Sequence, residues 1–224
     1  DCVRGFAAVS VLLYHCIELF EWSDFPESLV WFRVGWMGVD MFFALSGLVV
    51  TLSIFREMTV NEKSFRQMFL VKRIARLLPL HYLTMGTMMV FVLPDLLVQH
   101  GFFLNLLTHL LFIHNMFQGY HGGINGSNWS VGTELQFYLV VCLFAPIIRR
   151  ARSTSLACIS LFISWSWRWF SFMYVRKSDQ VQNLTFSTFW LSTQLPGMLD
   201  SFMFGILLAK HIWCASKELP IGTE

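Results

Sequence analysis

The feature that most constrains this fold is a series of apolar runs, each long enough to cross a bilayer as a helix. A helical span needs about 20 apolar residues, because the hydrocarbon core is ~30 Å thick and a helix rises about 1.5 Å per residue. Such runs lie near residues 2–20, 35–55, 77–98, 129–148, 156–175 and 188–213. Their length favours helices over the strands of a membrane barrel, which alternate over shorter segments. The sequence therefore predicts an all-α polytopic membrane protein, a bundle of about six to seven transmembrane helices.

The composition fits this class. Hydrophobic residues make up 55% of the 224 positions and charged residues only 13%, whereas soluble domains average about 25% charged residues. The net charge of +2 is small, so we expect no nucleic-acid partner. The five cysteines form no CxxC pair, which indicates neither a disulfide framework nor a metal site. The chain begins without Met and ends in a short polar tail, and we expect it to be part of a longer protein.

Orientation in the membrane follows from the basic residues between the runs. The segment 56–76 carries six Lys and Arg residues and should be cytoplasmic, whereas 21–34 is acidic and aromatic and suits the outer surface. The N-terminus is then expected to be cytoplasmic. Pro196-Gly197 interrupts the last run, so its spanning part should begin near residue 196.

Residues 102–117 form a shorter apolar segment that carries Asn105, His109, His114 and Asn115. The basic residues of 149–153 should also be cytoplasmic, so two spans must separate them from 56–76. We therefore interpret 102–117 as a short interfacial or re-entrant helix on the outer side. In the alternative, 102–117 crosses the membrane and 149–153 lies outside.

Two ionisable residues mark the first run. Arg4 and His15 are eleven residues apart, which places them on one helix face about 16 Å from each other. Taken one at a time, Arg4 is explained as an interface anchor whose side chain snorkels toward the headgroups, and His15 as a side chain that forms a hydrogen bond between helices. Together on one face, they favour a functional pathway that extends through half of the bilayer.

Two carboxylates lie in later runs. Asp40 should reach a depth close to that of His15 in an antiparallel hairpin, so we expect a contact in which Asp40 orients the imidazole. Glu134 follows the helix start at Trp129 and has no local cation, which makes it a candidate site residue. The small residues of the second run favour close helix packing; they are Gly35, Gly38, Ser46 and Gly47.

Arg73 and Arg76 are three positions apart, so both guanidinium groups project from one helix face. Paired Arg side chains suit phosphate groups. The alternative is an ordinary positive-inside cluster that contacts anionic lipid.

In order and spacing, these stretches resemble the acyltransferase-3 family of integral membrane acyltransferases. The motifs are Arg-x10-His (Arg4, His15), GVDMFFALSG (38–47), Arg-x-x-Arg (Arg73, Arg76), WSVGTELQFY (129–138) and QLPGMLDSFMFGILLA (194–209). The resemblance covers essentially the whole chain. Family members carry about ten spans, so the resemblance implies a truncated member, a partial transmembrane domain over 1–224.

The resemblance implies an O-acetyltransferase of the cell envelope, in the inner (plasma) membrane of a bacterium. It would use cytoplasmic acyl-CoA, most simply acetyl-CoA, as co-substrate, with no bound cofactor or metal. Its acceptor would be a hydroxyl of an extracytoplasmic glycan. Arg4, Arg73 and Arg76 would bind the acyl-CoA phosphates. His15 would be the general base or a transient acyl carrier, oriented by Asp40, and Glu134 would bind the acceptor or shuttle a proton. Residues that line or shape the site would be Gly38, Phe43, Ser46, Gly47, Trp129, Ser130 and Tyr138.

Three other functions are compatible with the sequence. A proton-coupled transporter would also carry buried His, Asp and Glu, but would move a solute without consuming acetyl-CoA. A structural or sensory membrane protein would tolerate His15→Ala. An enzyme of the same kind could instead acylate an amine, a lipid or a small molecule.

Overall fold

The computed structural model describes residues 2–19, 27–177 and 184–218, and these are almost entirely helical, with no strand among them. The α-helices are α1 (Cys2–Leu19), α2 (Gly38–Val60), α3 (Phe65–Thr87), α4 (Phe102–Leu110), α5 (Trp129–Arg150), α6 (Ser153–Lys177), α7 (Leu184–Ser192) and α8 (Leu195–Glu218). Short 3-10 helices cover Glu27–Met37, Pro94–Val98, His114–Met116 and Gly126–Asn128, and a π-helical turn covers Met88–Val92. The predicted all-α class is confirmed.

Four helices in the described part are long and apolar enough to cross a membrane: Val30–Val60, Phe65–Val92, Gly126–Arg150 and Leu195–Ser216. The predicted number of six to seven spans is therefore not confirmed. The expected spans near 2–20 and 156–175 do form helices, α1 and α6, but neither is among the four. In α6, several serines together with Arg168 lower the mean hydropathy.

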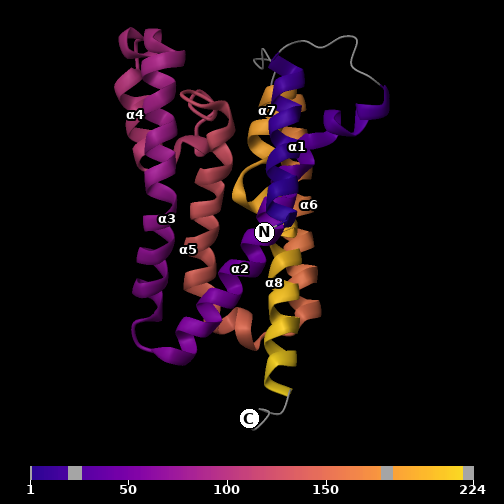
Figure 1. The fold of residues 1–224 in the computed structure, drawn as a ribbon. Coiled ribbons are helices and arrows are strands. Elements are labelled where there is room, and N and C mark those ends of the chain that lie inside the picture. The colour runs from indigo at the N-terminus through magenta and orange to yellow at the C-terminus, as the bar shows by residue number, and fades with distance from the viewer. Residues whose placement is uncertain (1, 20–26, 178–183, 219–224) are drawn as a thin grey trace.

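The two basic connections lie at the same end of the bundle. In Figure 1, the turn from α2 to α3 and the turn from α5 to α6 are both at the bottom, whereas α4 lies beside the upper part of α3. The segment 102–117 contains the nine-residue helix α4 and the 3-10 turn His114–Met116. Neither element is long enough to span a bilayer. This arrangement has the connectivity expected when 102–117 does not cross the bundle. The side of the membrane at which each end lies stays a prediction.

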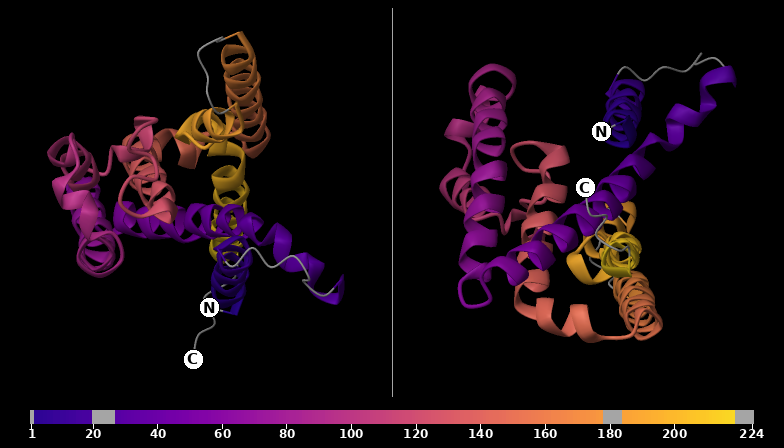
Figure 2. Two further views of the ribbon diagram at one scale, coloured as in Figure 1. Left: turned by 90° about the horizontal axis from the view of Figure 1, so that it is seen from above. Right: turned by 60° about the horizontal axis from the view of Figure 1, so that its bottom comes forward.

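Helix α2 runs obliquely across the bundle and packs against α1, α3, α5 and α8 (Figure 2). Its crossing with α8 is unusually close: a Cβ atom on Gly47 would lie 2.1 Å from the carbonyl oxygen of Phe202. A Cβ atom on Gly205 would lie 1.8 Å from the carbonyl oxygen of Ala44. Glycine at both positions allows the two backbones to touch, as in other membrane helix pairs.

Aromatic rings fill the centre of the bundle beside this crossing. The rings of Phe43 and Phe202 stack with centroids 4.5 Å apart, and those of Phe137 and Phe202 with centroids 3.9 Å apart. All three side chains are buried. They tie α2, α5 and α8 into one core, and this core fixes the wall of the site described below.

Helix α5 is held by two basic side chains from other helices. Pro146 has no N–H to donate, so the carbonyl group of Cys142 loses its helical partner. Arg66 of α3 donates its Nε–H to that carbonyl oxygen at 3.3 Å. The buried ammonium group of Lys210 donates to the carbonyl oxygens of Ile148 and Arg149 at the C-terminal end of α5. These bonds satisfy carbonyl groups that the helix leaves open.

Candidate active site

One cavity of about 350 Å³ lies where α1, α2, α3 and α5 meet. Its wall combines apolar side chains with a concentration of charged and polar ones. The predicted site residues that line it are Arg4, His15, Phe43, Ser46, Arg73, Arg76, Trp129, Ser130, Glu134 and Tyr138. Four separate stretches of sequence thus contribute to a single internal space.

Arg4 and His15 line this cavity together from α1. The helix is continuous over Cys2–Leu19, so the eleven-residue spacing puts both side chains on its cavity side. The imidazole of His15 lies edge-on to the ring of Tyr14, with centroids 5.3 Å apart. The two ionisable residues of the first run therefore share one cavity.

The cationic part of the wall comes from α3 as well as α1. Arg73 and Arg76 both line the cavity, as their spacing on one helix face predicts. The guanidinium of Arg73 is within electrostatic range of Arg4, Arg76 and Glu134. None of the three arginines forms an ion pair in the described parts of the chain. The wall thus presents three arginines and, among its described residues, a single carboxylate, that of Glu134.

Glu134 supplies the acidic part of the wall. Its Oε1 atom accepts a hydrogen bond from the Ser46 hydroxyl at 2.7 Å and another from the Tyr138 hydroxyl at 2.6 Å. Tyr138 lies one helical turn after Glu134 on α5, and Ser46 faces it from α2. The carboxylate is therefore oriented by side chains from two helices.

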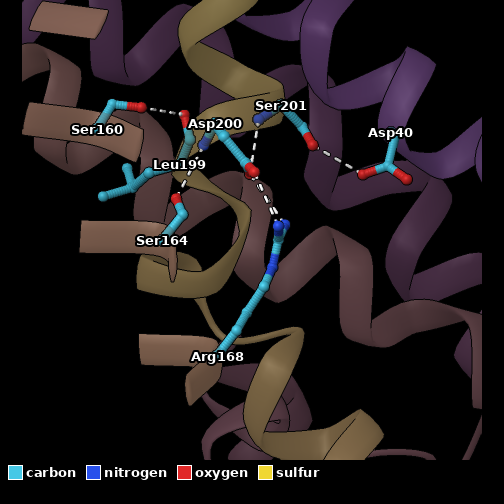
Figure 3. Close-up of polar contacts among 7 residues, drawn as sticks. All are labelled: Asp40, Ser160, Ser164, Arg168, Leu199, Asp200 and Ser201. Atoms are coloured by element: carbon cyan, nitrogen blue, oxygen red, sulfur yellow. Dashed lines mark hydrogen bonds and ion pairs between the residues drawn. The ribbon is translucent and has the colours of Figure 1, made fainter. Parts of the chain in front are cut away.

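Asp40 lies elsewhere. It is not among the cavity-lining residues, and its Oδ1 atom accepts a hydrogen bond from the Ser201 hydroxyl at 2.7 Å. Figure 3 shows this carboxylate directed toward α8. Asp40 and His15 form no ion pair in the described ranges, so the structure does not bring together the expected pair.

The predicted glycines also lie outside the cavity wall. Gly38 meets α1, where a Cβ atom would lie 2.7 Å from the carbonyl oxygen of Ala7, and Gly47 meets α8 as described above. Both are helix-packing residues, the function that small residues favour in membrane bundles.

Sequence reasoning missed an ion pair beside Asp40. Arg168 of α6 forms a bidentate contact with Asp200 of α8, at 2.8 and 3.0 Å, and the Asp200 carboxylate also accepts the backbone N–H of Ser201 (Figure 3). Asp40, Ser201, Asp200 and Arg168 thus form a polar chain from α2 to α6. The available signal was a pair of opposite charges inside two of the apolar runs, Arg168 in 156–175 and Asp200 in 188–213, because charges within apolar segments usually pair.

A histidine cluster was missed as well. Each of four buried histidines, from α3 and the segment after it, has one ring nitrogen within hydrogen-bond distance of a backbone carbonyl: His81, His109, His114 and His121. The rings of His109 and His114 stack with centroids 4.0 Å apart. Burial lowers the pKa of His109 to about 4 and that of His114 to about 3. The polar residues in 102–117 were the available signal, but their mutual packing depends on the turns between the helices.

A bundle of apolar helices with a cavity that arginines, a histidine and an oriented carboxylate line together is typical of a membrane-embedded enzyme or transporter. The family model of the acyltransferase domain, acyltransferase-3, matches residues 1–219. The chain therefore belongs to the acyltransferase-3 family.

Named relatives add detail. YrhL of Bacillus subtilis, which is named as a candidate peptidoglycan O-acetyltransferase, is 31% identical over 195 residues, which cover 80% of this chain and 29% of YrhL. The peptidoglycan O-acetyltransferase OatA of Listeria monocytogenes is 25% identical over 154 residues, which cover 62% of this chain and 22% of OatA. The chain thus spans less than a third of the length of these two relatives. No solved structure matches the chain significantly.

Proposed function

We propose that this protein is an O-acetyltransferase that moves an acetyl group from cytoplasmic acyl-CoA to a hydroxyl of an extracytoplasmic carbohydrate. The observation that carries the proposal is the gathering of Arg4, Arg73 and Arg76 on one cavity that also contains His15 and Glu134. Three guanidinium groups that share a confined space with one carboxylate favour a polyanionic ligand, and the phosphates of coenzyme A supply one. The names of the relatives support acetyl transfer to a peptidoglycan hydroxyl.

In this mechanism, Arg4, Arg73 and Arg76 bind the phosphates and direct the thioester into the cavity. His15, as a neutral imidazole, accepts the proton of the acceptor hydroxyl while the oxygen attacks the thioester carbonyl carbon. The carbon–sulfur bond then breaks, and the imidazolium returns the proton to the departing thiolate. Alternatively, His15 carries the acetyl group transiently before the hydroxyl attacks.

The other polar residues have supporting functions in the proposal. The Glu134 carboxylate, held by Ser46 and Tyr138, binds the acceptor hydroxyl or shuttles its proton. Asp40 would orient His15 only indirectly, through the packing of α2, because its carboxylate accepts a hydrogen bond from Ser201. The bilayer places donor and acceptor on opposite sides, with the N-terminus cytoplasmic in a bacterial inner membrane.

The proposal is tested with radiolabelled acetyl-CoA and membranes that contain the protein and a glycan acceptor. We expect label in the glycan with the parental protein, and a loss of at least about 100-fold with His15→Ala or Arg4→Ala, because a general base and a phosphate contact each contribute strongly. His100→Ala is the matched control, because His100 is exposed in the turn before α4 and does not line the cavity. Parental transfer rates in both cavity variants would overturn the assignment, and solute uptake without acetyl-CoA consumption would indicate the transporter instead.

A further inference from the structure

Tyr138 is buried, with only 5% of its surface exposed, yet it lines the cavity. Its hydroxyl donates to Glu134 Oε1 at 2.6 Å. The Ser46 hydroxyl donates to the same atom at 2.7 Å. Two donors on one oxygen restrict the rotation of the carboxylate, and neither of them uses Oε2, which can therefore accept a hydrogen bond from a bound hydroxyl.

The ring of Tyr138 makes a second contact of a different kind. The guanidinium carbon of Arg73 lies 5.9 Å from the centroid of this ring and 5.7 Å from that of Phe69. The two rings themselves meet edge-on, with centroids 6.3 Å apart. Arg73 also donates an Nη2–H to the carbonyl oxygen of Val49 at 3.3 Å. Arg73 is therefore seated on two aromatic rings and attached to α2.

Tyr138 thus contacts a cation and a carboxylate of the cavity through different parts of one side chain. We propose that Tyr138 is a positioning residue with two separable effects: its hydroxyl fixes Glu134 for the acceptor step, and its ring holds Arg73 in place for the donor phosphates. The inference rests on the proposed acetyl transfer and adds to it the residue that sets the relative placement of the two substrates.

The two effects are separable by substitution. Tyr138→Phe retains the ring under Arg73 but removes the hydrogen bond to Glu134. We expect it to lower kcat about tenfold or more, the effect of losing a hydrogen bond to a charged group, while KM for acetyl-CoA stays unchanged. Ser46→Ala removes the other donor to the same oxygen and should give the same pattern. Tyr138→Leu also removes the ring and should raise KM for acetyl-CoA roughly threefold to tenfold as well.

Two controls isolate the effect. Tyr82→Phe removes a hydroxyl that donates to the carbonyl oxygen of Leu110 outside the cavity, and should leave both constants at the parental value. In a Glu134→Gln protein, Tyr138→Phe should have little additional effect on kcat, because the hydroxyl acts through that carboxylate. A structural loss of folded protein would instead lower the rate by the same factor in both backgrounds.

The outcomes separate this inference from the proposed function. If the parental protein transfers acetyl groups and Tyr138→Phe matches it in kcat, the hydroxyl has no positioning effect and the inference is wrong, although the enzyme assignment stands. Full additivity with Glu134→Gln would also overturn it. If the parental protein transfers no label, the proposed function fails. The effect of the Tyr138 ring on Arg73 is then tested by measuring the affinity of each variant for acetyl-CoA. Tyr138→Leu should bind acetyl-CoA more weakly than Tyr138→Phe, and equal affinities would contradict the inference.

Discussion

His109 and His114 show how a few residues can organise an irregular segment. Their rings stack beneath the turns that follow α4, and each ring has one nitrogen within hydrogen-bond distance of a backbone carbonyl, of Asn105 and Asn128 respectively. An imidazole that binds a carbonyl must donate, so the other nitrogen, His109 Nε2 or His114 Nδ1, is a lone-pair acceptor. Both of these atoms are buried without a hydrogen-bond partner among the described residues. Protonation would place unpaired positive charges in the stack.

The cluster predicts a loss of stability in acid. In the folded state, burial lowers the pKa of His109 from 6.5 to about 4, whereas the unfolded imidazole titrates at its ordinary value. Stability is therefore complete above pH 6.5 and falls as the pH decreases toward 4, because only the unfolded state binds the proton in that range. The cost is on the order of 3 kcal/mol for His109.

Thermal unfolding in detergent checks this prediction. The Tm should fall between about pH 7 and about pH 4.5, and His109→Asn, whose amide can replace the donating ring nitrogen, should reduce the slope. Equal slopes in the parental protein and His109→Asn would show that this histidine is not responsible.

At the scale of elements, the crossing of α2 and α8 decides the shape of the cavity. Phe43, Ser46 and Val50 line the cavity on α2, while Gly47 contacts the backbone of α8 between them. Helix periodicity puts these residues on adjacent faces, so the packing face and the cavity face belong to the same turns. Separating α2 from α8 would therefore move part of the cavity wall.

Gly47→Ala tests this dependence. Its Cβ atom would lie 2.1 Å from a backbone oxygen that cannot rotate away, so we expect a destabilisation of about 2 kcal/mol or more and a lower Tm. Gly86→Ala in α3 is the matched control, because nothing lies within 4 Å of the added atom. That change should stabilise the helix slightly, by about 0.5–1 kcal/mol. A Gly47→Ala protein as stable as Gly86→Ala would contradict the close crossing.

At the scale of the whole molecule, the connectivity places the basic turns together. The α2–α3 and α5–α6 turns lie at one end of the bundle, and the loop that precedes α5 lies at the other (Figure 1). Only α3 and α5 cross the bundle between the two basic turns, because α4 returns beside α3. The charge rule then predicts that the basic end is cytoplasmic.

Cysteine accessibility checks this topology. In a background without the native cysteines, of which Cys2, Cys158 and Cys214 are exposed, we expect Lys63→Cys and Arg152→Cys to react with an impermeant maleimide only after the membrane is opened. Gly119→Cys, in the loop before α5, should react in intact cells. Labelling of position 152 from outside would show that 102–117 crosses the membrane.

The sequence alone determined the helical class and identified α2, α3, α5 and α8 as apolar helices. It also determined that Arg4 shares a helix face with His15, and Arg73 with Arg76. These properties depend on run length and helical periodicity, which are local. The structure alone decided that Asp40 meets Ser201, that Arg168 meets Asp200, and that Tyr138 lies between Arg73 and Glu134. Each of these pairings depends on the angle and rotation of helices distant in the chain, and those are set by backbone contacts at glycines and by stacked rings rather than by the spacing of the charges.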